Sequence, residues 1–220
     1  MEDHLYARLD LASGLRILDA GAGSGYVAIH MAGKGLNVQA VDITPLHLED
    51  AQRNIEKRSL QDKVSVRLGD YHDLSDFPDG SFDGVYTMET FVHADDPAKV
   101  LRNFHRLLRP GGVLVLNEAD LTATPTYCRM YSACHTVRTL SRKVLWAEML
   151  AEVGFIDIDV EDLTDEVLPL WRLFGVIGYI PYRTLQAVGL HGRFTNLMAG
   201  VETYLHWGEG RYISVKAVRA

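Results

Sequence analysis

The chain has 220 residues, of which 47% are hydrophobic and 23% charged, and its formal net charge is −7. This length and composition fit a single globular domain spanning residues 1–220, with a full core. The acidic balance argues against nucleic acid as the main partner, because phosphate binding usually leaves a basic footprint. Residues 1–4 begin acidic and no apolar signal-peptide segment follows, so we expect a cytoplasmic protein.

Strands and helices alternate regularly through the first half of the chain. The apolar pattern and turn residues predict, in order, a helix at 3–12, a strand at 16–19, a helix at 24–32, a strand at 38–42, a helix at 44–58, and strands at 64–68 and 82–88. A helix that starts at Asp96 and Pro97 and a strand at 113–117 complete this half. Such alternation predicts an α/β fold with a parallel sheet and helices on both faces.

The pattern changes after Glu118. Residues 119–140 are expected to be irregular to helical, followed by a helix at 141–152 and strands at 155–160 and 211–218. The segment 163–208 is rich in large apolar side chains and has no place in the alternation. We therefore expect 119–140 and 163–208 to form a helical cap over the ligand-binding face.

Cysteine and histidine give no sign of a metal site or a disulfide. Cys128 and Cys134 lie six positions apart, which on a helix would place them on different faces, so we expect free thiols. The nine histidines contain no HxxxH or HxH pairing that would predict metal ligation. We therefore expect no metal ion.

A glycine-dense turn joins the first strand to the first long helix. Residues 19–25 read D-A-G-A-G-S-G, and glycines at these places let the backbone approach a ligand beside the helix N-terminus. Tyr26 stands where the dinucleotide pattern G-x-G-x-x-G needs its last glycine, and no Lys-Ser or Lys-Thr follows as in a P-loop. The turn therefore predicts a ligand site that is neither a dinucleotide-binding site nor a P-loop.

The pattern from Asp19 to Gly25 resembles the first motif of class I S-adenosylmethionine (SAM) methyltransferases. The resemblance implies SAM as cofactor and a Rossmann-like fold with a seven-stranded, mostly parallel sheet whose last strand is antiparallel. Asp42 ends the second strand, where a carboxylate can accept hydrogen bonds from both ribose hydroxyls. Asp70 follows the third strand, where this class contacts the adenine amino group, and Tyr71 beside it could cover the ring. The expected cofactor-binding residues are Asp19, Ala20, Gly21, Gly23, Gly25, Asp42, Ile43, Asp70, Tyr71 and Met88.

A second resemblance narrows the family. Residues 80–94, G-S-F-D-G-V-Y-T-M-E-T-F-V-H-A, look like the segment of sterol 24-C-methyltransferases in which a Glu, a short spacer and His-Ala follow the fourth strand. Glu89 and His93 are four apart, so one helical turn would bring them together, and we expect them to be catalytic. Glu118 is a third candidate base. A cofactor-side hydrogen bond or helix cap for Glu89, and a structural role for His93, remain open.

The predicted function is SAM-dependent methyl transfer to a lipophilic small molecule such as a terpenoid, prenylated or sterol-like metabolite, at carbon. Two alternatives are O- or N-methylation of a natural product, with Glu89 or His93 as general base, and a SAM-binding cyclase or regulatory protein. Large side chains of the predicted cap suit an apolar acceptor: Tyr127, Tyr131, Trp171, Phe174, Tyr179 and Tyr182. We expect the remaining apolar surface to be covered in a homo-oligomer. Arg172 and Pro181 interrupt the longest apolar run, which argues against stable membrane insertion.

Overall fold

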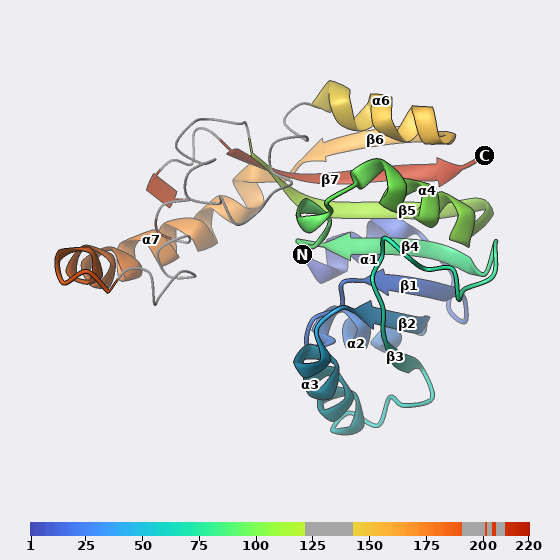
Figure 1. The fold of residues 1–220 in the computed structure, drawn as a ribbon, viewed down its shortest axis with the longest axis horizontal. Helices are drawn as coiled ribbons and strands as arrows, with labels where there is room; N and C mark the ends of the chain where they lie inside the picture. Colours follow the sequence, from blue (N-terminus) through green and yellow to red (C-terminus); the bar gives the residue numbers. More distant parts are fainter. Residues whose placement is uncertain (122–142, 191–200, 202–203, 206–209) are drawn as a thin grey trace.

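In the computed structural model, seven strands form one sheet with the order β3-β2-β1-β4-β5-β7-β6 (Figure 1). The structure describes residues 1–121, 143–190, 201, 204–205 and 210–220. The strands are β1 (Arg16–Ala20), β2 (Asn37–Asp42), β3 (Val64–Leu68), β4 (Phe82–Met88), β5 (Leu108–Leu121), β6 (Phe155–Asp162) and β7 (Gly210–Arg219). Strands β1 to β5 are parallel, and β7 runs antiparallel to β5 and β6. The predicted Rossmann-like sheet with an antiparallel last strand is confirmed.

Helices cover both faces of this sheet (Figure 1). They are α1 (Glu2–Leu9), α2 (Tyr26–Gly33), α3 (Pro45–Glu56), α4 (Pro97–Leu107), α6 (Lys143–Val153) and α7 (Thr164–Ala187), with a 3-10 turn, η1, at Phe91–His93. Helices α1, α2 and α3 contribute to one apolar cluster, and α4 and α6 contribute to the other. The sheet therefore separates two cores.

Helix α4 shows how local sequence builds this arrangement. The Asp96 carboxylate accepts a hydrogen bond from the Lys99 N–H at 2.9 Å and so caps the helix, and Pro97 occupies the first turn. Four apolar side chains that recur with the helical period are fully buried on one face: Val100, Leu101, Phe104 and Leu107. Burial of each such side chain contributes about 1.5–3 kcal/mol.

Most element boundaries are shifted by a few residues from the sequence prediction, as for α1, predicted at 3–12 and observed at Glu2–Leu9, and two of the differences bear on the site. Helix α2 begins after Gly25, whose left-handed conformation (φ 77°) ends the preceding turn. Strand β5 is much longer than the predicted 113–117, because β7 pairs with it as far as Leu121, beyond the end of β4. Glu118 consequently lies inside β5 and not at its end.

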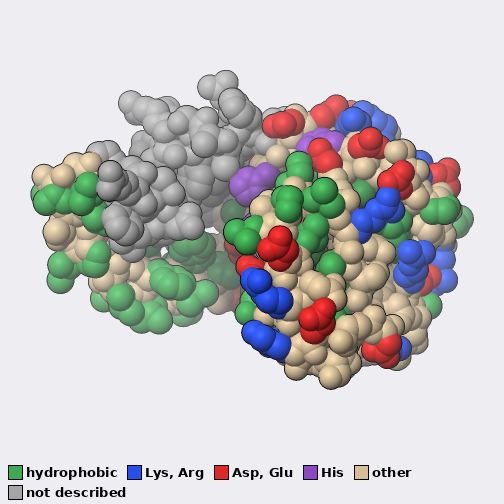
Figure 2. Space-filling view, turned by 60° about the horizontal axis from the view of Figure 1, so that its bottom comes forward, with side chains coloured by type: hydrophobic (Ala, Val, Ile, Leu, Met, Phe, Trp, Pro, Cys, Tyr) green, Lys and Arg blue, Asp and Glu red, His purple; other side chains and the backbone are tan. Residues whose placement is uncertain are grey.

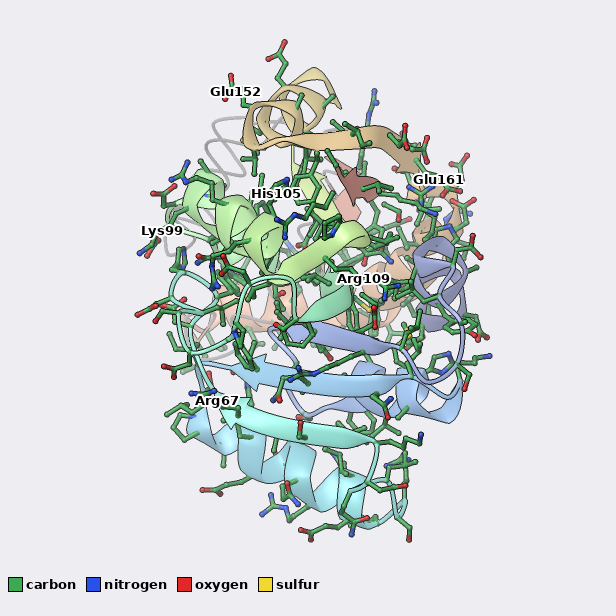
Figure 3. All side chains as sticks on the ribbon, turned by 90° about the vertical axis from the view of Figure 1, so that its right-hand side faces the viewer. Arg67, Lys99, His105, Arg109, Glu152 and Glu161 are labelled. Carbon is green, nitrogen blue, oxygen red and sulfur yellow. The ribbon has the colours of Figure 1, made fainter. Side chains whose placement is uncertain are left out.

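The topology fixes where a ligand can bind. Strand β1 lies between β2 and β4, so the order of strands reverses at β1. Open α/β sheets bind ligands beyond the carboxyl ends of the strands at such a switch point. Helix α1 is fastened to β6: His4 Nε2 lies 3.1 Å from Glu161 Oε2, and Arg8 pairs with Asp159 (Figure 3 labels Glu161).

Helix α7 follows β6 and runs outward on the side where the parallel strands end (Figure 1). One side of it is buried, with Val167, Gly175, Gly178 and Tyr182. Large apolar side chains are exposed over the rest of the helix, among them Leu170, Leu173, Phe174, Val176, Ile177, Tyr179 and Ile180. Figure 2 shows hydrophobic side chains gathered in this part of the molecule.

The segments predicted as a cap are described in part. Residues 122–142, with Tyr127, Tyr131 and both cysteines, lie outside the described residues, as do 191–200, 202–203 and 206–209. Residues 119–121 belong to β5, and 164–187 form α7. Among the helices that the structure describes, none is long and apolar enough to cross a membrane.

Candidate active site

A pocket of about 450 Å³ opens at the carboxyl ends of the parallel strands, within the size range of small-molecule sites. It is lined by Gly21, Gly23, Asp42, Ile43, Thr44, His47, Gly69, Asp70, Tyr71, His72, Glu89, Thr90, His93 and Asp95. Eight of the twelve predicted site residues are among them: Gly21, Gly23, Asp42, Ile43, Asp70, Tyr71, Glu89 and His93. The structure therefore brings together residues from four strand ends.

The glycine-rich turn packs tightly against the turn after β4. The N–H groups of Gly21 and Ala22 both donate to the Val41 carbonyl at 2.9 Å, which ties the loop to β2. Gly21 has φ 96°, and a Cβ there would lie 2.6 Å from the Thr90 side chain. The Thr90 hydroxyl donates to the Ala20 carbonyl at 2.8 Å. Glycine at 21 is thus required both by its backbone conformation and by its neighbour.

Asp42 organises the second strand end. Its Oδ2 accepts a hydrogen bond from the Gly23 N–H at 2.8 Å, and its Oδ1 accepts one from the Thr44 N–H at 2.8 Å. The His47 Nδ1 lies 3.3 Å from the same Oδ1. A carboxylate has about four lone-pair sites, so Asp42 keeps acceptor capacity for hydroxyl groups in the pocket.

The third strand end carries a second acid and a linked histidine. Asp70 Oδ1 accepts a hydrogen bond from the His72 N–H at 2.8 Å and lies 2.7 Å from His72 Nδ1. His72 Nε2 accepts from the Asp95 N–H at 3.1 Å, which assigns the ring proton to Nδ1. Tyr71 donates to the Thr90 carbonyl at 3.0 Å, and its burial raises the pKa of the phenol. These bonds join the β3 end to the turn after β4.

Asp19 lies beneath the glycine-rich turn and not on the pocket surface. It is 2% exposed, and its Oδ2 has no hydrogen-bond partner among the residues that the structure describes. Burial raises the pKa of Asp19 to about 7, an effect that Tyr86 opposes and the charge of Asp42 reinforces. A buried carboxylate oxygen without a partner is costly, and a cationic ligand group at the turn would satisfy it.

The turn after β4 presents the two predicted catalytic residues. Glu89 is exposed in the pocket and adopts a left-handed conformation with φ 57°, and its N–H donates to the Asn117 carbonyl at 2.9 Å. His93 ends η1 and also lines the pocket. Glu118 does not line it, because its side chain is buried below the turn. Burial raises the pKa of Glu118 to about 7, against hydrogen bonds that favour the ionised form.

Ala20, Gly25 and Met88, like Asp19, do not line the pocket. Ala20 is fully buried, although its carbonyl holds Thr90. A Cβ on Gly25 would lie 3.0 Å from the Cβ of Ala51, so this glycine allows α2 and α3 to pack closely. Met88 packs against the apolar cluster below α1 and α2. Ala20, Gly25 and Met88 therefore shape the site from behind.

Sequence reasoning missed six lining residues: Thr44, His47, Gly69, His72, Thr90 and Asp95. A signal existed for four of them, because each lies within five positions of Asp42 or Asp70 at a strand end. Thr90 and Asp95 gave no such signal. In the described part of the chain, no group of three or more His, Cys, Asp or Glu side chains is placed to hold a metal ion.

Comparison with known proteins decides the family. A family model described as "Methyltransferase domain" matches residues 18–116. The S-adenosyl-L-methionine-dependent Diels-Alderase iccD of Talaromyces variabilis is 32% identical over 229 aligned positions, which cover 98% of this chain and 78% of that protein. The chain belongs to the SAM-dependent methyltransferase family. SAM is accordingly the cofactor of this enzyme, and the glycine-rich turn, the acidic strand ends and the unpartnered Asp19 oxygen fit it.

Other members of the family show its range. The ubiquinone biosynthesis O-methyltransferase of Xanthomonas oryzae pv. oryzae is 33% identical to this methyltransferase-family protein over 177 positions, which cover 77% of this chain and 73% of that protein. The crystal structure of the [4+2]-cyclase SpnF has the same fold, with a TM-score of 0.81 over 99% of this chain and 79% of that chain, at 21% identity. Proteins similar to this chain in sequence or in fold are therefore named for different reactions.

Proposed function

We propose that the protein transfers the methyl group of SAM to a lipophilic small molecule of natural-product type. One observation carries the proposal: a single pocket joins the glycine-rich turn and two acidic strand ends to the exposed Glu89 and His93. The glycine-rich turn and the acidic strand ends suit a cofactor, and Glu89 and His93 lie where an acceptor would approach. SAM supplies a methyl group already activated on a sulfonium, so the protein mainly has to align the acceptor and exclude water.

We assign cofactor contacts to the residues of the polar side. Asp42 would accept hydrogen bonds from the ribose hydroxyls and Asp70 from the adenine amino group, with Tyr71 beside the ring. The unpartnered Oδ2 of Asp19 suits the ammonium group of the methionine part. Gly21 and Gly23 keep the backbone close enough for these contacts.

The exposed apolar side chains of α7 support two parts of the proposal: that the acceptor is lipophilic and that the chain forms a homo-oligomer. Ile180 on α7 is 75% exposed, and Ile177 and Val176 are 67% and 66% exposed. Apolar surface of this extent marks a contact with a lipophilic ligand or another protein. We propose that α7 contributes to an apolar wall for the acceptor and that a second copy of the chain covers the remainder. Light scattering should then give a dimer or larger species, and a strict monomer would contradict the assembly.

SAM-dependent cyclisation without methyl transfer is a second candidate. It is favoured by the similarity to the Diels-Alderase iccD, which extends over 98% of this chain. In that case the pocket would hold SAM permanently, and the acceptor side would fold a polyene into a reactive conformation.

One experiment separates the two functions. The protein is incubated with SAM carrying a trideuterated methyl group and a panel of prenylated, terpenoid and polyene compounds, with catechols and amines as polar controls. Methyl transfer adds the label to the apolar compounds, whereas cyclisation gives an isomer of unchanged mass. Labelling of only the polar controls would contradict a lipophilic acceptor.

Asp42→Ala is expected to weaken SAM binding by about 1.5–3 kcal/mol, the scale of charge-assisted hydrogen bonds. The variant removes both the proposed ribose acceptor and the oxygens that hold the N–H groups of Gly23 and Thr44. Calorimetry with SAM and S-adenosylhomocysteine measures the loss. Glu49→Ala, at an exposed acid on α3 outside the pocket, is the control. Equal affinity in the two variants would remove Asp42 from the site.

A further inference from the structure

One buried carboxylate holds the turn that follows β4. Glu118 of β5 is fully buried, and its Oε1 accepts a hydrogen bond from the Thr87 hydroxyl at 2.6 Å. The same oxygen accepts hydrogen bonds from the N–H groups of Phe91 at 3.0 Å and Thr90 at 3.3 Å. Its Oε2 accepts from the Val92 N–H at 3.4 Å. One side chain therefore satisfies three consecutive backbone N–H groups.

Consecutive N–H groups that converge on one point form a site for an anion. Here the anion is supplied by the protein itself. The preceding residue, Glu89, has φ 57°, a conformation that costs energy for any residue other than glycine. The bond from its own N–H to the Asn117 carbonyl fixes one side of the turn, and the Glu118 carboxylate fixes the other. The strained conformation persists because it is held at both ends.

The turn also touches the cofactor side of the pocket. The Thr90 hydroxyl donates to the Ala20 carbonyl at 2.8 Å, and the Tyr71 hydroxyl donates to the Thr90 carbonyl at 3.0 Å. The Phe91 ring packs against Trp146, with ring centroids 5.5 Å apart. Glu118 thus anchors a piece of backbone that carries Glu89 and His93 at its two ends and contacts the glycine-rich turn in its middle.

We propose that Glu118 is a positioning residue that fixes the 89–93 turn and thereby holds Glu89 and His93 at the acceptor side of the pocket. The inference rests on the proposed function only for what those two side chains do. Glu118 itself does not line the pocket, so it acts through the backbone and not on the acceptor. The positioning role replaces the one expected from the sequence, in which Glu118 is a third candidate base.

Hydrogen exchange measures the positioning directly and needs no acceptor. In Glu118→Gln the charge is lost and an NH₂ group faces N–H donors, so the amides of residues 90–92 should exchange roughly tenfold faster, the factor for weakening a charge-assisted bond to a neutral one. Glu118→Leu removes every acceptor and should give a larger increase. Thr87→Val is the matched control, because it removes one buried hydrogen bond to Glu118 but leaves the three backbone bonds.

The increase in amide exchange rate should be confined to the peptide that contains residues 90–92 and should grow in the order Thr87→Val, Glu118→Gln, Glu118→Leu. The SAM affinity of Glu118→Gln should stay within about threefold of the parent. With a labelled acceptor from the panel, Glu118→Gln should lower kcat more than it changes the KM for SAM. Unchanged exchange at 90–92 in both Glu118 variants would overturn the proposal whether or not the parent methylates any compound. An increase spread evenly over the chain would also overturn it, since that reports general destabilisation.

Discussion

Gly21→Ala is expected to lose measurable SAM binding and to lower the free energy of unfolding by roughly 2–5 kcal/mol, from overpacking and a disfavoured backbone conformation together. A Cβ at this position would lie 2.6 Å from the Thr90 side chain. Thr90 cannot move aside cheaply, because its hydroxyl is bonded to Ala20 and its carbonyl accepts from Tyr71. Relief of the clash must therefore displace either the glycine-rich turn or the turn after β4, and both line the pocket.

Gly14→Ala is the control that isolates the clash. Gly14 has φ 90°, close to the value at Gly21, but a Cβ there would meet nothing within 4 Å. It should cost only the conformational strain, about 1 kcal/mol, and leave SAM affinity unchanged. Denaturant unfolding and calorimetry with S-adenosylhomocysteine compare the two variants. Equal losses in both would mean that backbone conformation alone explains the glycine at 21.

The sequence was informative where local chemistry decides the structure. Asp19, Asp42 and Asp70 each follow a short apolar run, and parallel strands bring their carboxyl ends to one edge whatever the remaining details. The strand–turn–helix pattern therefore predicted both the fold and the edge of the sheet at which the pocket opens. The length of β5 was not accessible in this way, because it depends on pairing with β7, which lies about 90 residues further along the chain.

The positions that sequence reasoning could not assign are those set by contacts between distant segments. Glu118 looks like one more acid at the end of a strand, and only the pairing of β4 with β5 places it under the 90–92 amides. The Thr90 side chain contacts a glycine 69 positions away. Such contacts have no periodic signal, and they determine how the pocket is held together and not which ligand it binds.

Acidic side chains line the pocket on both sides, at the ends of β2 and β3 and on the turn after β4. Asp42, Asp70, Glu89 and Asp95 line it, and Asp19 lies just behind. This excess of acidic groups favours a cationic cofactor over an anionic one. The charge of Glu89 also reaches β7, where burial first and then the Glu89 and Glu118 carboxylates raise the pKa of Tyr212. Glu89 is thus an exposed carboxylate whose charge acts on a buried phenol.

Glu89→Gln and His93→Ala are expected to reduce turnover by roughly 10²-fold or more, the range over which a positioned acid or base acts, while SAM affinity changes little. Both side chains line the pocket from the turn after β4, and neither makes the contacts that hold the glycine-rich turn. Glu89→Gln keeps the shape and removes the charge, so its effect reports proton transfer or stabilisation of positive charge on the acceptor. The measurement pairs labelled methyl transfer to a responsive acceptor with calorimetry on SAM.

The pattern of losses assigns the role of each residue. If the reaction removes a proton from a hydroxyl or amine, acceptors of lower pKa should rescue the slower variant, whereas an alkene acceptor should show no such rescue. Glu49→Gln, at an exposed glutamate outside the pocket, should turn over at the parent rate. Loss of SAM binding in Glu89→Gln would place this carboxylate on the cofactor side instead. Parent-like turnover in both Glu89→Gln and His93→Ala would exclude them from the chemistry and leave the pocket to bind and orient the acceptor alone, as the cyclisation alternative requires.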